Sequence, residues 1–294
     1  MRILTYTVTP EEDGRMVKGI LRGSLQLSYT LLKSLKWREN AILLNGQSVH
    51  VNAIVHAGDV VSVALSERTP REDLYCANAA KPDIVYEDDD LLVLNKPAGV
   101  AMHPKSGDAS APSLAAMLTS YLGEGSVPHF VSRLDKGTSG LLIAAKNGYV
   151  HDRLRRALHS SNLRREYRAV AVGRVEPPCG VIDAPIGRAE GSIIRRCVRA
   201  DGLPSLTEYE ALQVSGRFTL LRLRPQTGRT HQLRVHMAYL GHPLAGDWLY
   251  GTEDKTLIAR PALHSYELWF TQPVIGLELH FTAPIPQDMQ RLME

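Results

Sequence analysis

Apolar and polar positions alternate along most of this chain in short runs, and only a few segments show the longer spacing of a helix. The first eight residues alternate as a strand does. Helical spacing begins at about Ser28, whose side chain is suited to cap the helix. Asn45-Gly46 separates two apolar runs and predicts a hairpin, and a further strand follows Gly58-Asp59.

These elements predict three parts of the chain. Residues 1–66 are expected to form a small α/β module. Residues 67–82 are polar and lack periodicity, which is typical of a linker. Regular apolar runs return after the linker, so a larger unit is expected over residues 83–294.

The larger unit is rich in predicted strands. Amphipathic helices are expected at residues 113–122, 147–159 and 230–240. Strands are expected at residues 84–87, 91–95, 140–145, 167–175, 206–214, 218–224, 262–270 and 277–282. Hairpins dominate, and strands and helices do not alternate steadily. The predicted fold class is therefore α+β, with a mixed, mainly antiparallel sheet and flanking helices.

The composition is that of an ordinary globular protein. The 294 residues are 44% hydrophobic and 22% charged, and the mean hydropathy is -0.15. No apolar run approaches the roughly 20 residues that a membrane-spanning helix needs, and the amino terminus lacks the pattern of a signal peptide. Cys76, Cys179 and Cys197 are widely separated and form no metal-binding motif. These features predict a cytoplasmic protein that does not associate with membranes.

Positive charge is concentrated in one stretch. The whole chain has a formal net charge of only +3. Residues 141–200 contain twelve Lys and Arg against five Asp and Glu, a net charge of +7, so the rest of the chain carries -4. This concentration is typical of a surface that contacts phosphates, although a solvated helix face has the same appearance.

A short charged motif precedes one of the predicted buried strands. Arg133-Leu-Asp135 lies just before Thr138-Ser139-Gly140. A carboxylate close to a guanidinium, on a loop that enters a core strand, is suited to act as a preorganised acid. Taken alone, such a triplet usually forms a surface ion pair.

Other segments accompany this motif in a characteristic order. They are Asn95-Lys-Pro-Ala-Gly99, Arg133-Leu-Asp-x-x-Thr-Ser-Gly-Leu141, Glu166-Tyr-Arg-Ala169, Pro225-Gln-Thr-Gly-Arg-Thr-His-Gln-Leu-Arg-Val-His236 and Gly241-His-Pro-Leu-Ala-Gly-Asp-Trp-Leu-Tyr-Gly251. Together they resemble the RluA/RluD-type family of pseudouridine synthases over roughly residues 84–292. The resemblance implies a mixed antiparallel sheet with a central RNA-binding cleft and isomerisation of uridine to pseudouridine.

The resemblance also implies roles for individual residues. Asp135 matches the catalytic aspartate, and Arg234 matches the basic residue that pairs with it and orients it. Tyr167 matches a tyrosine that stacks on the uracil ring. Arg133 matches an arginine that holds the target nucleotide out of its helix, and Leu233 matches an apolar residue in the pocket wall. Further substrate-binding residues are expected in the same motifs, namely Thr138, Arg229 and His231.

Several alternatives remain open at this point. Outside the motif context, Tyr167 and Leu233 have the character of plain core residues. His231 and His236, with His242 nearby, are spaced unlike the ligands of a metal site, so no metal is expected. No cofactor is expected either, because the isomerisation consumes neither electrons nor phosphate and no nucleotide-binding motif is present.

The amino-terminal module resembles a small RNA-binding domain first known from a ribosomal small-subunit protein. It departs from that pattern because closely spaced basic residues are few; Arg22, Lys33, Lys36 and Arg38 remain. Its contribution to RNA capture is therefore an open question.

The expected function is isomerisation of specific uridines in structured RNA, either ribosomal large-subunit RNA or tRNA, by a protein expected to be a monomer. Whether Asp135 attacks the ribose or the base is not determined by the sequence. One alternative is a non-catalytic RNA-binding protein that kept the fold. Another is a hydrolase that uses Asp135 to cleave the glycosidic bond.

Overall fold

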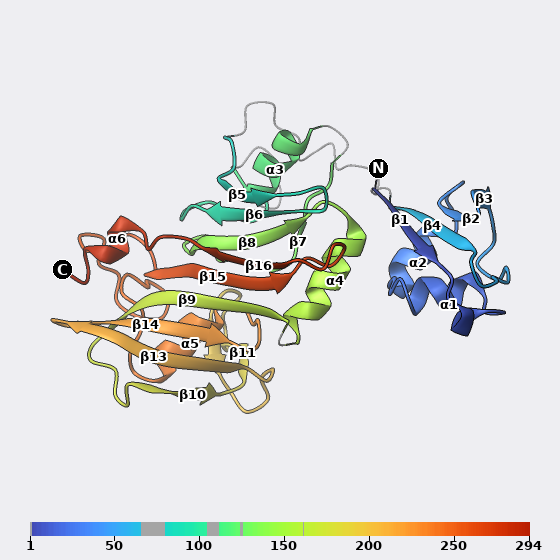
Figure 1. Ribbon diagram of the computed structural model, residues 1–294. Coiled ribbons are helices and arrows are strands. Elements are labelled where there is room, and N and C mark those ends of the chain that lie inside the picture. The colour runs from blue at the N-terminus through green and yellow to red at the C-terminus, as the bar shows by residue number, and fades with distance from the viewer. Residues whose placement is uncertain (1, 66–79, 105–111, 124–125, 161) are drawn as a thin grey trace.

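The structure is a computed structural model that describes residues 2–65, 80–104, 112–123, 126–160 and 162–294 (Figure 1). Most of the expected linker, residues 67–82, lies outside the described residues, as does Cys76. Two sheets account for most of the strands, a small one near the amino terminus and a large one that forms the rest of the fold.

The amino-terminal sheet has four strands in the order β1-β4-β2-β3. Its segment contains β1 (Arg2–Thr7), the 3-10 helix η1 (Pro10–Glu12), α1 (Val17–Arg22), α2 (Tyr29–Leu35), β2 (Ile42–Leu44), β3 (Gln47–Ser48) and β4 (Val60–Leu65). Ser28 caps α2 by accepting a hydrogen bond from the Leu31 amide (3.2 Å). Asn45 and Gly46 have positive φ angles of 51° and 82°, as the predicted hairpin turn requires. The sequence pattern did not predict α1, which is only six residues long and contains Gly19.

The large sheet has ten strands. Eight of them follow the order β10-β13-β14-β9-β15-β8-β6-β5, while β16 pairs with β15 and β7 pairs with β8. Their bounds are β5 (Ile84–Glu87), β6 (Leu91–Lys96), β7 (His129–Phe130), β8 (Ser139–Ala145), β9 (Leu163–Val172), β10 (Cys179–Asp183), β13 (Leu206–Ser215), β14 (Phe218–Pro225), β15 (Leu263–Thr271) and β16 (Glu278–Thr282). Among the strand pairs that the described residues form in this sheet, only β15–β8 is parallel. The expected α+β fold with a mixed, mainly antiparallel sheet is thus confirmed.

Helices and one separate hairpin flank this sheet. They are α3 (Leu114–Leu122), α4 (Gly148–Leu158), the hairpin of β11 (Ile186–Arg188) and β12 (Arg196–Val198), α5 (Gln232–Tyr239) and α6 (Gln287–Gln290). Ser113 and Asn147 cap α3 and α4, respectively, by accepting hydrogen bonds from backbone amides, which confirms both expected helix starts. Helix α4 contacts β8 and β9, and α5 contacts β14 and β12. In the view of Figure 1, α5 lies behind the sheet. Among the described residues, no helix has the length and apolar character needed to cross a membrane.

The bounds of strand β9 differ from those predicted from the sequence. The predicted strand ran from Tyr167 to Val175, but the observed one begins four residues earlier and ends at Val172. The run Arg164-Arg165-Glu166 has no apolar alternation, so its sequence gives no strand signal. Pairing with β15 makes it a strand, and Arg164 lies opposite Trp269 in that pair.

The amino-terminal segment is attached to the larger unit at α4 and at Asp90. Arg153 Nη1 donates to Gln26 Oε1 (2.6 Å), and Arg156 Nη2 donates to the Gln26 carbonyl (3.1 Å). A further ion pair joins Arg2 to Asp90, at 3.1 Å. One cluster of buried apolar side chains also includes residues from both parts. The loop between α1 and α2 therefore contacts the same helix that borders the candidate active site described below.

Candidate active site

A cavity of about 610 Å³ contains every site residue predicted from the sequence. Its walls come from the loop before β8, from β9, from one side of α4 and from the start of α5 with the loop before it. The predicted residues that line it are Asp135, Arg234, Tyr167, Arg133, Leu233, Thr138, Arg229 and His231. Its size lies within the range of about 300–1,000 Å³ that is usual for small-molecule sites. Folding thus gathers residues from three separate motifs around one space.

The loop that carries Asp135 is held mainly through its backbone. Lys96 Nζ donates a hydrogen bond to the Lys136 carbonyl (3.3 Å), and Arg260 Nη1 donates to the Gly137 carbonyl (3.3 Å). These contacts do not use the Asp135 carboxylate, whose side chain is 31% exposed. The loop is therefore fixed while the acid itself faces the cavity.

Lys96 is a supporting residue that the sequence interpretation did not single out. Its side chain is completely buried, and its ammonium also donates to the carbonyls of Pro97 (2.8 Å) and Val100 (3.0 Å). Burial, followed by the charge of Arg260, lowers the pKa of Lys96 to about 8, while Asp135 acts in the opposite direction. The only sequence signal for this role was its place in the Asn-Lys-Pro-Ala-Gly segment.

Arg234 lies between two carboxylates. Its Nη1 is 3.4 Å from Asp135 Oδ2, whereas Nε and Nη2 each donate to Asp247 at 2.7 Å. Asp247 is completely buried and also accepts hydrogen bonds from the amides of Leu249 and Tyr250. Burial alone would lower the pKa of Arg234, but the hydrogen bonds and charge of Asp247, together with the charge of Asp135, raise it. The sequence analysis did not predict Asp247, which is the stronger partner of Arg234.

His231 and Tyr250 form a second polar contact beside the acid. His231 Nδ1 is 2.8 Å from the Tyr250 hydroxyl, and His231 Nε2 is 3.9 Å from Asp135 Oδ2. The Tyr250 hydroxyl also accepts a hydrogen bond from the Arg196 amide (3.0 Å). Burial lowers the pKa of His231; Asp135 opposes this shift and Arg234 reinforces it. His231 is thus expected to be neutral at neutral pH. Sequence reasoning did not find Tyr250.

Tyr167 and Leu233 line the apolar part of the cavity. Each side chain is 6% exposed, and both belong to one buried apolar cluster. The two interpretations of these residues are therefore compatible, because they pack in the core and also border the cavity. Thr138, which is buried, borders the same space, and its amide donates to the Asp135 carbonyl (3.0 Å).

Arginines surround the polar part of the cavity. Arg133 is exposed, and Arg229 is held by a hydrogen bond from its Nε to the Pro204 carbonyl (3.1 Å). Arg155 on α4 and Arg165 on β9 line the same space. With Arg234, five guanidinium groups line this cavity, and they favour a ligand that carries phosphates.

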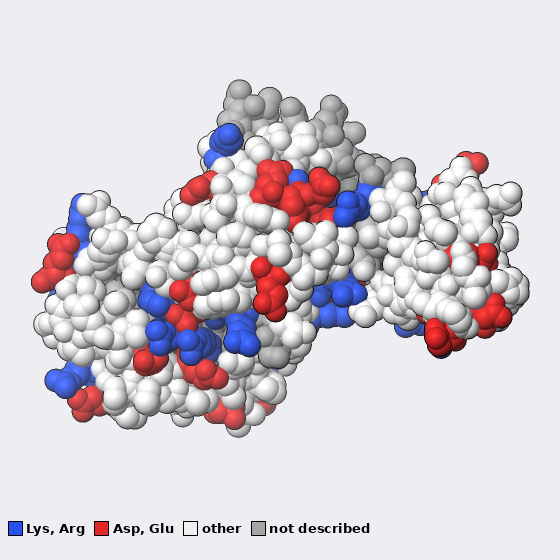
Figure 2. All heavy atoms as spheres, viewed as in Figure 1, with Lys and Arg blue, Asp and Glu red and all other residues white. Residues whose placement is uncertain are grey.

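The arginine-rich stretch does not form a single phosphate-contacting face. Only part of it borders the cavity, and Arg168 points to the other side of the sheet, where it contacts Glu166 and lies 4.0 Å from the Tyr266 ring centroid. Arg222 and Arg224 bind the same Glu166 from β14. Figure 2 shows this side, where Lys and Arg intermix with Asp and Glu over β9, β13 and β14. Strand alternation divides the arginines between two faces, so a count along the sequence could not assign them.

The histidines near α5 have separate environments. His236 is completely buried, with Nδ1 2.9 Å from Thr207 Oγ1 and Nε2 3.0 Å from the Ala184 carbonyl. His242 Nδ1 lies 3.1 Å from a different carbonyl, on Val172. Across the described part of the chain, no three His, Cys, Asp or Glu side chains come together as metal ligands would.

A carboxylate and an arginine in a cavity surrounded by guanidinium groups, with an aromatic side chain in the wall, form a site for an unstacked base of a nucleic acid. This places the protein among the enzymes that modify nucleic acids. Residues 90–239 match the family model for RNA pseudouridylate synthase.

Individual relatives extend this match over nearly the whole chain. The uncharacterized RNA pseudouridine synthase YjbO of Bacillus subtilis is 38% identical over 92% of this chain and 96% of its own length. Ribosomal large subunit pseudouridine synthase D of Vibrio parahaemolyticus is 37% identical over 99% of this chain and 94% of its own. The solved structure of human RNA pseudouridylate synthase domain containing 1 is 28% identical with a TM-score of 0.57, covering 69% of this chain and 83% of that one. The chain belongs to the RNA pseudouridylate synthase family and isomerises uridine to pseudouridine in RNA.

Proposed function

We propose that Asp135 is the essential carboxylate of this pseudouridine synthase. The observation that carries the proposal is the placement of its Oδ2 3.4 Å from Arg234 Nη1, in the cavity that Tyr167 and Leu233 also line. The reaction breaks the bond between uracil N1 and ribose C1′, turns the base and joins C5 to C1′. The C5 proton leaves and N1 gains a proton, so the nucleotide keeps its composition. A carboxylate assists either as a nucleophile or by stabilising positive charge on the ribose.

In this proposal Arg234 orients Asp135, and Asp247 in turn positions Arg234. The two 2.7 Å hydrogen bonds from Asp247 fix the plane of the guanidinium group. That orientation directs the remaining Nη1 towards Asp135. Asp247 is thus a positioning residue, since it touches Arg234 and not the space for the substrate.

The remaining lining residues bind the target nucleotide. Tyr167 stacks on the uracil ring, and Leu233 supplies an apolar wall. Arg133, which is exposed, holds the nucleotide outside its helix. Polar contacts to the substrate come from Thr138, Arg229 and His231.

Large-subunit ribosomal RNA is the proposed substrate, and tRNA is the alternative. Incubating the protein with a transcript of each RNA, as described below, distinguishes the two. The support is the name of the Vibrio relative, a ribosomal large subunit pseudouridine synthase that matches this chain almost end to end. The arginines around the cavity suit any structured RNA, so they do not choose between the two.

The amino-terminal module, residues 1–66, is proposed to assist RNA capture, with residues 67–82 as its linker to the catalytic unit, residues 83–294. Tyr29 and Trp37 on and just after α2 are 66% and 85% exposed. Lys33 and Lys36 are also exposed, and the spacing of these four residues places them along one side of the helix. Exposed aromatic and basic side chains together suit contacts with bases and phosphates.

The protein is further proposed to act as a monomer in the cytoplasm. Cys179 and Cys197 are free thiols, which is the usual state in a reducing compartment. All the predicted site residues come from one chain, so the cavity needs no second copy.

The function is tested with an unmodified large-subunit rRNA transcript and a tRNA transcript. New carbodiimide-reactive positions are expected in the rRNA, and Asp135→Asn is expected to abolish them while RNA binding persists. Retained activity in Asp135→Asn would overturn the assignment of the acid. Release of free uracil would indicate a hydrolase, and binding without any modified base would indicate a non-catalytic protein. Mapping pseudouridines in total RNA from cells with and without the gene then identifies the uridine.

A further inference from the structure

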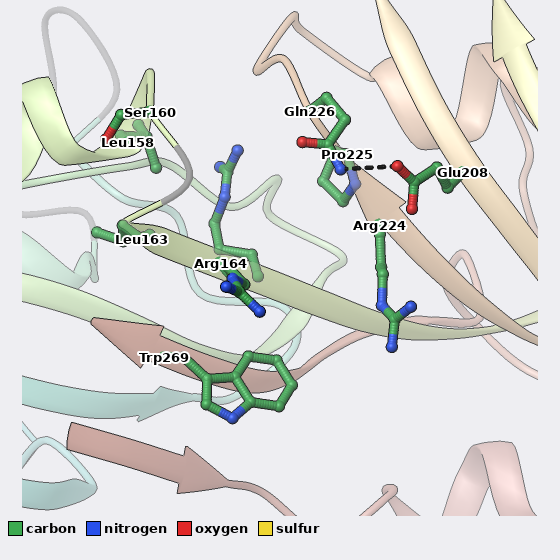
Figure 3. A pocket seen from close by; sticks show the side chains of 10 residues that line it. Leu158, Ser160, Leu163, Arg164, Glu208, Arg224, Pro225, Gln226 and Trp269 are labelled. Carbon is green, nitrogen blue, oxygen red and sulfur yellow. Dashed lines mark hydrogen bonds between the residues drawn. The ribbon is translucent and has the colours of Figure 1, made fainter. Parts of the chain in front are cut away.

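A second cavity, of about 390 Å³, adjoins the candidate active site. Figure 3 shows the side chains that line it. The two cavities share three lining residues, Leu158, Arg165 and Pro225. The second cavity contains none of the residues assigned above to catalysis or to binding of the target uridine.

Arg164 and Trp269 lie on the face of the sheet opposite to Arg165 and Tyr167. The pairing of β9 with β14 ends at Tyr167 and Leu223, and the two cavities meet in the gap beyond that pair. An RNA strand that leaves the active site past Arg165 passes through this gap to reach the second cavity.

The second cavity combines guanidinium groups with one large aromatic side chain. Arg164 and Arg165 come from β9, Arg224 from the end of β14, and Trp269 from β15. In Figure 3, Arg164 extends towards the Trp269 side of the cavity, and Arg224 flanks it from the neighbouring strand. This combination is the one that single-stranded nucleic acid requires, with cations for the backbone and a flat surface for a base.

Two of these side chains are fixed before any ligand binds. Trp269 stacks on the His280 ring with 4.7 Å between centroids and an interplanar angle of 7°. Arg224 Nε donates to Glu166 Oε2 at 2.8 Å. Side chains that are already ordered lose less conformational entropy when a ligand binds.

Hydrogen-bonding groups complete one wall. Gln226 Nε2 donates to Glu208 Oε1 at 3.0 Å, drawn as the dashed line in Figure 3. The Gln226 side-chain carbonyl oxygen and the second Glu208 oxygen are acceptors, so this wall suits an N–H group on the edge of a base, such as N3–H of uracil.

We propose that the second cavity binds a nucleotide adjacent to the target uridine in the same RNA strand. Its base stacks on Trp269, and Arg164, Arg165 and Arg224 contact the phosphates on either side. This inference rests on the proposed function, because it takes the target uridine to occupy the first cavity. It adds a substrate requirement: the strand next to the modified uridine must be unstacked as well.

The test compares a ligand that reaches both cavities with one that fills only the first. Binding of 5′-fluorescein-labelled heptauridylate to the full chain is measured by fluorescence anisotropy, and uridine 5′-monophosphate is measured as its competitor. Trp269→Leu is expected to weaken heptauridylate binding about tenfold, the usual effect of losing one stacked base. Binding of uridine 5′-monophosphate should not change. Trp248→Leu is the matched control, because Trp248 is 55% exposed and lines neither cavity.

Unchanged heptauridylate binding in Trp269→Leu, or an equal loss for both ligands, would overturn the proposal. Arg164→Gln provides a second variant should Trp269→Leu fail to fold. It should lower the slope of log affinity against log salt by about 0.7 for heptauridylate, since one phosphate contact to a single strand is lost. An unchanged slope would count against the site. These measurements involve no chemistry, so they are independent of whether Asp135 proves essential.

Discussion

Glu166 and Asp135 both contact arginines, but they differ in how many arginines bind the carboxylate and in how much of it is exposed. Glu166 binds Arg168, Arg222 and Arg224, and its side chain is only 3% exposed. Asp135 lies 3.4 Å from a single arginine, and its side chain is 31% exposed. The loop around Asp135 is instead held through backbone carbonyls, which leaves the acid available to a ligand.

The contrast separates a structural carboxylate from one that is suited to chemistry. A carboxylate whose oxygens are all used by fixed cations holds strands together but cannot approach a substrate. One that is oriented on one side and open on the other can do so. The difference is testable, because changing each residue should affect a different property of the protein.

The largest expected effect is on activity. Asp135→Asn should lower kcat by roughly three orders of magnitude or more, because the amide cannot replace the carboxylate as nucleophile or as stabilising charge. The unfolding free energy should change by less than about 1 kcal/mol, since Asp135 has few fixed partners. Tritium release from a transcript labelled at uracil C5 measures the rate. Asp89→Asn, with a side chain that is 89% exposed, is the control. If Asp135→Asn loses much of its unfolding free energy but keeps its turnover, the contrast drawn between Asp135 and Glu166 is wrong.

Asp247→Asn should lower both stability and activity. Removing the buried charge beside Arg234 leaves that guanidinium poorly compensated, which costs about 3 kcal/mol. Arg234 should also lose its fixed orientation towards Asp135, so kcat should fall more than KM rises. Urea unfolding and steady-state kinetics measure the two effects. Unaltered kcat in the folded variant would contradict the positioning role.

The pKa of Lys96 predicts how stability depends on pH. Below about pH 8 this lysine is charged in both the folded and the unfolded state. As the pH rises from about 8 to about 10.5, the folded state loses the proton first, so the unfolded state binds more protons. The Lys96 contribution to the unfolding free energy should therefore increase with pH across this window, by up to about 3 kcal/mol. Urea unfolding of the unmodified protein and of Lys96→Met at pH 8 and pH 10 isolates this contribution. If the unfolding free energies of the two proteins change with pH by the same amount, the pKa of Lys96 is not lowered in the folded state.

Glu166→Gln should show the opposite pattern to Asp135→Asn, with the smallest effect on turnover. Three arginines lose their shared partner, and partial exposure of Arg222 and Arg224 limits the expected loss to about 2 kcal/mol of unfolding free energy. The kcat of the folded variant should stay close to that of the unmodified protein. Thermal unfolding measures the loss of stability, and the tritium assay measures kcat. A strong loss of kcat with normal stability would show that this network acts in catalysis.

Local sequence determined most of the secondary structure, and its motifs supplied the candidates for the site. Ser28, Ser113 and Asn147 cap their helices, and Asn45-Gly46 forms its hairpin turn, because these features depend on neighbouring residues alone. The eight site residues predicted from the motifs all line the same cavity. The part each one plays in the reaction stays a prediction.

The tertiary structure decided which charges meet. Arg234 reaches Asp135 across 99 positions in sequence, and its stronger partner, Asp247, lies 13 positions away. Nothing in a local pattern distinguishes these two carboxylates, because the pairing depends on how the β8 loop and α5 pack together. The same holds for the second cavity, where Arg164 and Trp269 become neighbours only through the pairing of β9 with β15. Sequence supplied the groups, and strand pairing and burial determined which of them remain open to RNA.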